Sequence, residues 1–132
     1  MIKFLGLDIG TKRIGVAISE NGLVASWGVV ANLNLAQAIF EIAQICRTQG
    51  IQKIVIGIPK AKDSLQADKI HKFALEIKKN LNLEIAFVDE TLTSREAERK
   101  LKDLKLDPRS KRYKEEVDRL SAKFILEQYL SK

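Results

Sequence analysis

Apolar residues near the amino terminus follow the spacing of β-strands. Residues 2–8 form a short apolar run that ends at an acid, and residues 13–19 continue in the same way after a glycine turn. The pair Asn21-Gly22 that follows is typical of a hairpin with a type I′ turn, because both residues tolerate positive φ angles. Residues 23–31 then return as a strand, so the chain is predicted to open with three antiparallel strands.

From residue 34 onward the spacing of the apolar residues changes from that of strands to that of helices. Asn34 and Gly50 are the expected cap and stop of a first helix. A continuous run of Ile and Val at residues 53–58 is typical of a strand that is covered on both faces. Asp63 or Ser64 then caps a second helix. Its predicted buried stripe is Leu65, Ile70, Phe73, Ala74 and Ile77.

The last third of the chain adds one strand and two helices. Residues 84–88 are a fifth predicted strand. Thr93 and Glu96 have the spacing of a capping box, which predicts a third helix that extends through Leu101 or Leu104. A proline break then precedes a final helix, whose apolar residues recur at helical spacing close to the end of the chain.

The order of these elements predicts a mixed sheet. Three antiparallel strands are followed by alternating helices and strands, which join through right-handed parallel crossovers. A uniformly alternating Rossmann domain does not begin with a hairpin, whereas the ribonuclease H-like fold is among those with this order. We therefore predict one α/β domain over residues 1–132. Its five-stranded sheet would combine a three-stranded antiparallel meander with parallel βα units, flanked by helices.

Composition narrows the class of protein. No segment approaches the ~20 apolar residues that a membrane span needs, and the first acid, Asp8, comes too early for a signal peptide. A cytoplasmic protein without a membrane partner is expected. Cys46 and His71 are the single cysteine and histidine. An intramolecular disulfide and a Cys/His zinc site are thus excluded, and any metal must be held by oxygen atoms.

Positive charge gathers in one segment. The formal net charge is +6, and residues 95–114 contribute most of it, with nine lysines and arginines against four acids. This favours an acidic partner such as nucleic acid, while a solvated surface would give the same pattern. Two further cations follow the first glycine turn. The candidate nucleic-acid-binding residues are Lys12, Arg13, Thr93, Arg95, Arg99, Lys111 and Arg112.

Two acids follow predicted strands. Asp8 ends the first strand and Glu90 follows the fifth, and ligands bind open α/β sheets at the carboxyl ends of such strands. Asp89 competes with Glu90, but side chains alternate in direction along an extended chain, so only one of the two should face the site. We choose Glu90 and expect Asp89 to be peripheral. The alternative roles are a turn cap for Asp8 and a helix-dipole acid for Glu90.

A third acid, Asp118, belongs to one face of the last helix. Ser121, Ala122, Ile125 and Tyr129 share this face, and their small or apolar side chains indicate that it is turned toward the sheet. Small residues would also let the helix approach the strand ends closely. A buried lone carboxylate is costly unless cations accompany it. The alternative is an acid in the first turn of the helix, favoured by the helix dipole.

Three convergent carboxylates without a histidine suit hard cations. Mg²⁺ and Mn²⁺ prefer oxygen ligands, and two such ions can activate a water and stabilise the leaving oxygen in phosphodiester hydrolysis. We therefore predict that Asp8, Glu90 and Asp118 are both the metal ligands and the catalytic residues of a nuclease.

Four motifs resemble those of the YqgF family, also called RuvX. Residues 6–19 read GLDIGTKRIGVAIS, which is similar to the opening motif of that family. The segments IVIGIP at 54–59, VDETLTS at 88–94 and VDRLSA at 117–122 follow in the same order as in the family. The resemblance covers essentially the whole chain.

The resemblance implies a ribonuclease H-like fold related to RuvC-type resolvases, with an acidic metal site at Asp8, Glu90 and Asp118. It implies a nuclease that matures the 5′ end of 16S ribosomal RNA in bacteria, with precursor rRNA on the ribosomal subunit as partner. Resolution of Holliday junctions, with branched DNA as partner, is the alternative. We expect a monomer or a weak homodimer. A stable dimer would favour junction resolution, which needs two symmetric sites.

Two rival classes of protein remain open. The Asp-x-Gly-Thr sequence at residues 8–11 also opens the phosphate-binding hairpin of actin-like ATPases and sugar kinases. Those proteins clamp a nucleotide between two such domains, and this chain supplies one. A non-catalytic nucleic-acid-binding module would keep the basic face and need no metal. The sequence does not decide between RNA and DNA.

Overall fold

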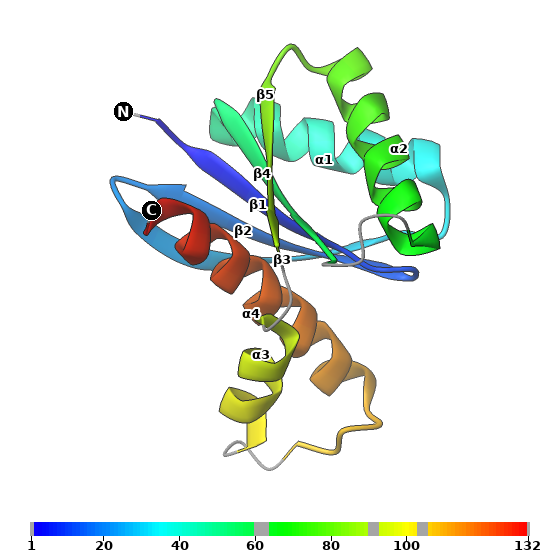
Figure 1. Ribbon diagram of the computed structural model, residues 1–132, viewed down its shortest axis with the longest axis vertical. Coiled ribbons are helices and arrows are strands. Elements are labelled where there is room, and N and C mark those ends of the chain that lie inside the picture. Colours follow the sequence, from blue (N-terminus) through cyan, green and yellow to red (C-terminus); the bar gives the residue numbers. More distant parts are fainter. Residues whose placement is uncertain (1, 60–63, 90–92, 103–105, 132) are drawn as a thin grey trace.

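A mixed five-stranded sheet lies between two helical layers (Figure 1). The computed structural model describes residues 2–59, 64–89, 93–102 and 106–131, and for residues 93–96 it describes the backbone alone. The strand order across the sheet is β3-β2-β1-β4-β5, so β1 is central. The strands are β1 (Phe4–Ile9), β2 (Arg13–Glu20), β3 (Leu23–Ala31), β4 (Lys53–Ile58) and β5 (Glu84–Asp89).

The first three strands form the predicted antiparallel meander, and β4 and β5 add to it in parallel. Asn21 and Gly22 make the turn between β2 and β3 with φ angles of 57° and 80°. These are the positive angles that the Asn-Gly pair led us to expect. The mixed sheet of the predicted fold class is therefore confirmed.

The helices divide between the two faces of the sheet. Helices α1 (Leu35–Gln49) and α2 (Leu65–Asn80) cover one face, and α4 (Lys111–Leu130) crosses the other (Figure 1). Helix α3 (Thr93–Lys102) packs against α4, and together they extend beyond the sheet. Among the helices of the described ranges, none has the length and apolar character required to cross a membrane.

Polar side chains set where three of the helices begin. The side chain of Asn34 accepts a hydrogen bond from the backbone N–H of Gln37, and Gly50 ends the same helix in the left-handed conformation, both as predicted. Ser64 caps α2, which decides between the two residues that the sequence allowed. Ser110 caps α4 by accepting from the N–H of Tyr113, a cap that the sequence analysis did not identify.

The assignment of Leu65 to the predicted core is wrong. Leu65 was assigned to the buried stripe of α2, but its side chain is 80% exposed. The reason is its position: it is the first residue of the helix, one turn before the axis reaches the apolar cluster that buries Ile70, Phe73 and Ile77. The predicted helical spacing was correct, but the predicted buried stripe began one turn too early.

Alternation along β1 separates the two faces of the sheet. Leu5, Leu7 and Ile9 point into the cluster under α1 and α2. Gly6 and Asp8 lie on the other face, toward α4, because neighbouring side chains of a strand point in opposite directions. The carboxylate at the end of β1 is thus directed to the side of the sheet that α4 covers.

Two strand glycines form a seat for α4, which we call the glycine seat (Gly6 and Gly15). A Cβ atom placed on Gly15 would overlap the backbone carbonyl oxygen of Asp118. At Gly6 it would lie 3.0 Å from Cβ of Leu126 and 3.1 Å from the carbonyl oxygen of Ala122. The backbone of α4 therefore rests directly on the sheet at both positions, and any larger residue there would push it away.

We expect Gly15→Ala to destabilise the fold by about 1–3 kcal/mol or more, because the added methyl group overlaps backbone atoms that cannot rotate away. Gly28→Ala is the matched control in the neighbouring strand, where a Cβ atom meets nothing within 4 Å. Urea denaturation of both variants measures the effect. Equal midpoints for the two variants would contradict the direct contact between α4 and Gly15.

Candidate active site

Asp8 and Asp118 both lie beside Gly15, near the carboxyl end of β1. In the β1–β2 ladder the partner of Asp8 is Gly15, and the two residues face the same side of the sheet. The backbone of Asp118 rests on Gly15, so Asp8 and Asp118 flank the same glycine from two different elements. The structure thus brings together two of the three predicted ligands, which lie far apart in the sequence.

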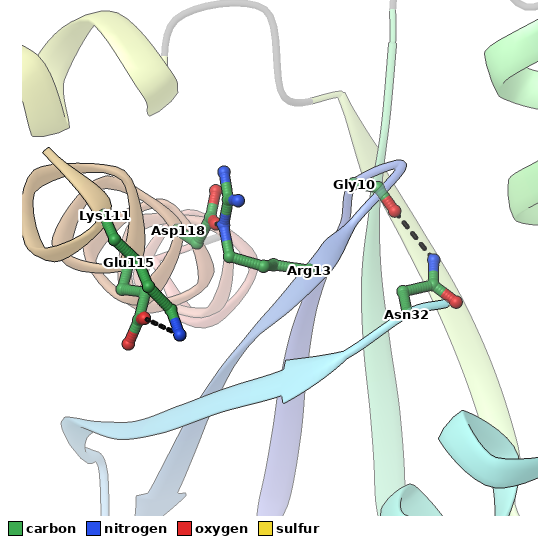
Figure 2. A network of polar contacts seen from close by, with 6 residues as sticks. All are labelled: Gly10, Arg13, Asn32, Lys111, Glu115 and Asp118. Atoms are coloured by element: carbon green, nitrogen blue, oxygen red, sulfur yellow. Dashed lines mark hydrogen bonds and ion pairs between the residues drawn. The ribbon is translucent and has the colours of Figure 1, made fainter. Parts of the chain in front are cut away.

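Asp118 is partly buried beneath Arg13. The Nε atom of Arg13 donates a hydrogen bond of 2.7 Å to Oδ2 of Asp118, and the two side chains are 28% and 20% exposed (Figure 2). Burial raises the pKa of the Asp118 carboxyl above its ordinary value, and the nearby Glu115 adds to the increase. The Arg13 guanidinium opposes the increase in pKa but does not cancel it. The ionised carboxylate therefore lacks full compensation by positive charge.

The position of Asp118 within α4 decides between its two predicted roles. The helix begins at Lys111, so Asp118 lies about two turns from its start. The alternative role, an acid in the first turn favoured by the helix dipole, is wrong, because the dipole effect is confined to that turn. Ser121, Ala122 and Ile125 are buried, which confirms that this face packs on the sheet.

Hydrogen bonds fix the turn that joins Asp8 to Arg13. The N–H of Gly10 donates to the carbonyl oxygen of Arg13 at 2.9 Å. Nδ2 of Asn32 donates to the Gly10 carbonyl oxygen at 2.7 Å (Figure 2). Nε2 of Gln66 donates to the Ile9 carbonyl oxygen at 2.9 Å. The turn is thus held from β3 and from α2, and it presents Arg13 to Asp118.

Several residues of this arrangement were absent from the sequence prediction. Asn32 and Gln66 gave no signal, because their partners are backbone carbonyls that a linear pattern does not reveal. Gly6 and Gly15 did give one, since glycine in the interior of a strand marks a close approach of another backbone. That signal was present in the opening motif and was not used.

The third predicted ligand, Glu90, lies outside the described residues, so its place in the site stays a prediction. Asp89 ends β5 with an exposed side chain, and its carbonyl oxygen accepts a hydrogen bond of 3.2 Å from Nε2 of Gln128. The side chains of Thr93 and Arg95 also lie outside the described set, although their backbones begin α3.

The remaining candidate nucleic-acid contacts are exposed cations on two parts of the surface. Lys12 lies on the turn between β1 and β2. Arg99 belongs to α3, and Lys111 and Arg112 to the first turn of α4. Lys111 forms an ion pair of 3.8 Å with Glu115 along the same helix as Asp118 (Figure 2). Arg13, the last of these candidates, is engaged with Asp118.

The described side chains provide some, but not all, of the ligands that a hard divalent cation needs. Asp8 and Asp118 offer carboxylate oxygens, and Arg13 donates to Oδ2 of Asp118. A partly desolvated carboxylate with incomplete compensation favours an added cation. The described ranges contain no group of three His, Cys, Asp or Glu side chains that could hold a metal. A complete site thus requires a further ligand, and Glu90 is the candidate.

The raised pKa of Asp118 has a consequence for stability. Because the carboxyl has a higher pKa in the folded chain than in the unfolded chain, stability falls as the pH rises through the folded value. Asp118→Asn removes this charge while it keeps an oxygen that can accept from Arg13. We expect the variant to be at least as stable as the wild-type protein at pH 7, and the difference to vanish below the ordinary Asp pKa of 3.8. A urea midpoint at pH 7 below that of the wild-type protein would contradict this expectation.

Solved structures of junction resolvases share this fold. The RuvC protein of Thermus thermophilus, in complex with a Holliday junction substrate, superposes with a TM-score of 0.63 over 99% of this chain and 96% of its own, at 10% sequence identity. The fowlpox virus Holliday junction resolvase superposes with a TM-score of 0.59 over 98% of this chain and 99% of its own, at 16% sequence identity. Identities this low show a common fold alone, and they confirm the predicted ribonuclease H-like architecture.

Relatives with higher identity cover almost the whole chain. A protein of Thermosynechococcus vestitus is 36% identical over 98% of this chain and 88% of its own length. A protein of Sulfurihydrogenibium sp. is 39% identical over 100% of this chain and 92% of its own length. Both carry the name "Putative pre-16S rRNA nuclease". The family model of RuvX, described as Holliday junction resolvase, matches residues 2–132. This chain therefore belongs to the RuvX family.

Proposed function

We propose that this protein is a divalent-metal-dependent nuclease that hydrolyses phosphodiester bonds with Asp8, Glu90 and Asp118. The observation that carries the proposal is that Asp8 and Asp118 flank Gly15 at one strand end, where α4 rests on the sheet. Burial disfavours the charged form of Asp118, and a carboxylate with a raised pKa of this kind is a candidate for a functional site. The oxygen atoms of the two carboxylates suit Mg²⁺ or Mn²⁺.

Each residue of the site has a role in this proposal. Asp8, Asp118 and Glu90 hold the cations, and two Mg²⁺ or Mn²⁺ ions, when bound, supply the Lewis-acid chemistry of hydrolysis. Arg13 orients the Asp118 carboxylate and places a positive charge beside the substrate phosphate. Exposed cations such as Lys12 and Arg99 hold neighbouring phosphates of the nucleic acid.

The first candidate substrate is the 5′ end of precursor 16S rRNA, carried by the ribosomal subunit. The names of the full-length relatives support it. With this substrate we propose a cytoplasmic protein that acts as a monomer or a weak homodimer. The second candidate is a four-way DNA junction, which the description of the family model supports. Both substrates need the same carboxylates, so the chemistry is independent of the choice between them.

Cleavage assays with labelled precursor rRNA and with a labelled four-way junction test the activity. We expect cleavage that requires Mg²⁺ or Mn²⁺, stops with a chelator, and falls by at least about a hundredfold in Asp8→Asn and in Asp118→Asn, because the ligands lose their charge. Glu127→Gln, an exposed acid on the same helix, is the matched control and should retain activity. Folded wild-type protein that binds either substrate without metal and cleaves neither would favour a non-catalytic binding module.

The choice between the two adjacent acids after β5 is tested separately. We expect Glu90→Gln to lose cleavage and Asp89→Asn to retain it, because an extended chain directs the two side chains to opposite sides. The two variants remove the same charge from neighbouring positions, so each is the control for the other. Loss of activity in Asp89→Asn alone would move the third ligand to Asp89.

A further inference from the structure

A cavity lies beside the active site, on the opposite face of the sheet. It has a volume of about 260 Å³ and opens between the turn after β1, the segment that leaves β3, and helix α2. Thr11 lies at the turn, Leu33 and Leu35 at the start of α1, and Lys69 and Lys72 on α2. Neither the predicted metal site nor the predicted nucleic-acid contacts include these residues. We call the cavity the α2 pocket.

The α2 pocket and the carboxylates share one turn of the chain. Ile9 and Gly10 line the pocket, and they directly follow Asp8 in the sequence. Asp8 faces α4, whereas Ile9 faces α1 and α2, so the turn at residues 10–12 separates the two sites. Asn32 and Gln66, which also line the pocket, hold this turn through their side-chain amides. A polymer that crosses the turn can occupy both sites at once.

The charge of the α2 pocket favours an anion. Lys69 and Lys72 are one helical turn apart on α2, so their ammonium groups extend to the same side. Neither forms an ion pair with any residue of the described ranges, and the described residues that line the cavity include no acid. Two uncompensated cations at a concave surface attract a phosphate group.

The other wall of the α2 pocket is apolar. Leu33 is 82% exposed and Leu35 is 38% exposed at its rim, and the buried ring of Phe73 lies at its base. These exposed apolar side chains offer contact to the flat face of a base. The side-chain carbonyl oxygens of Asn32 and Gln66 can accept from an amino or hydroxyl group, since each amide already donates through its nitrogen.

We propose that the α2 pocket binds one unstacked nucleotide of the substrate strand, next to the phosphodiester that the carboxylates hydrolyse. Lys69 and Lys72 would hold its phosphate, and Leu33 and Leu35 would contact its base. This proposal rests on the proposed nuclease function, and it adds a substrate class: nucleic acid with a single-stranded segment at the cleavage point. Bases inside a duplex are stacked and paired, so only an unstacked base can offer its flat face to Leu33 and Leu35.

Binding of a short fluorescent single-stranded RNA, compared with the blunt duplex that it forms with its complement, tests the pocket. The measurements use the full-length protein with a chelator present, which prevents cleavage, at several salt concentrations. The test variants are Lys69→Ala/Lys72→Ala, which removes the cations, and Leu33→Ser, which removes apolar contact without touching the core. Lys78→Ala/Lys79→Ala is the matched control, with the same charge change on the same helix outside the pocket.

We expect Lys69→Ala/Lys72→Ala to weaken binding of the single strand roughly tenfold and to make its salt dependence shallower by about 0.7, because the two lysines hold one phosphate and each contacted phosphate of a single strand contributes about 0.7. Leu33→Ser should weaken the same binding several-fold and leave the salt dependence unchanged. Duplex binding by these variants, and both affinities of the control variant, should stay nearly unchanged.

If Lys69→Ala/Lys72→Ala and Lys78→Ala/Lys79→Ala weaken binding of the single strand and of the duplex by the same factor, the proposed pocket is wrong. Such a result would show general electrostatic attraction between the lysines and nucleic acid. Unchanged binding of the single strand in the test variants would also overturn the pocket. If the wild-type protein cleaves nucleic acid but the test variants bind normally, the pocket alone fails. If the variants behave as expected but wild-type protein with Mn²⁺ cleaves nothing, the pocket stands and the nuclease proposal fails.

Discussion

The direct contact between the backbone of α4 and Gly15 determines the geometry of the candidate active site. A helix normally packs on a sheet through side chains on both surfaces, which keep the two backbones apart. Here the carbonyl oxygen of Asp118 occupies the space where a Cβ atom of residue 15 would lie, and Gly6 provides a second close approach near Ala122 and Leu126. The short aspartate side chain can therefore reach the end of β1, where Asp8 is located.

This packing has an electrostatic cost, and Arg13 reduces it. Asp118 must give up part of its hydration to lie against the sheet, and its pKa rises as a result. The guanidinium of Arg13, held by the turn that follows Asp8, supplies a charge-assisted hydrogen bond that partly compensates. A partly buried carboxylate with incomplete compensation lowers stability, and it would gain from a bound cation in the proposed function.

The sequence predicted most of the fold because local signals decided the elements. The turn at Asn21-Gly22, the cap at Asn34 and the spacing of apolar residues fixed five strands in the right order along the chain. The site was predicted less completely. Asp118 was placed on the correct face because its neighbours at helical spacing are small or apolar, but the glycine seat was missed, since small residues on the helix itself seemed sufficient for a close approach.

Other features could not be read from a linear pattern. The ion pair between Arg13 and Asp118 joins two residues that are adjacent only after folding, and a cation next to a glycine turn fits a phosphate contact equally well. The amide side chains of Asn32 and Gln66 bond to backbone carbonyls of the turn. Their roles depend on where three separate elements meet, which is a property of the folded chain and not of any one segment.

In the proposed function, Asp8 and Asp118, brought together on the glycine seat, hold the same divalent cation. A crystal structure of the protein soaked in Mn²⁺, with the ion located by its anomalous scattering, tests this most directly. We expect Mn²⁺ at the carboxyl end of β1, with carboxylate oxygens of both Asp8 and Asp118 among its ligands. An ion bound by only one of the two carboxylates, or crystals with Mn²⁺ only at other places, would contradict it.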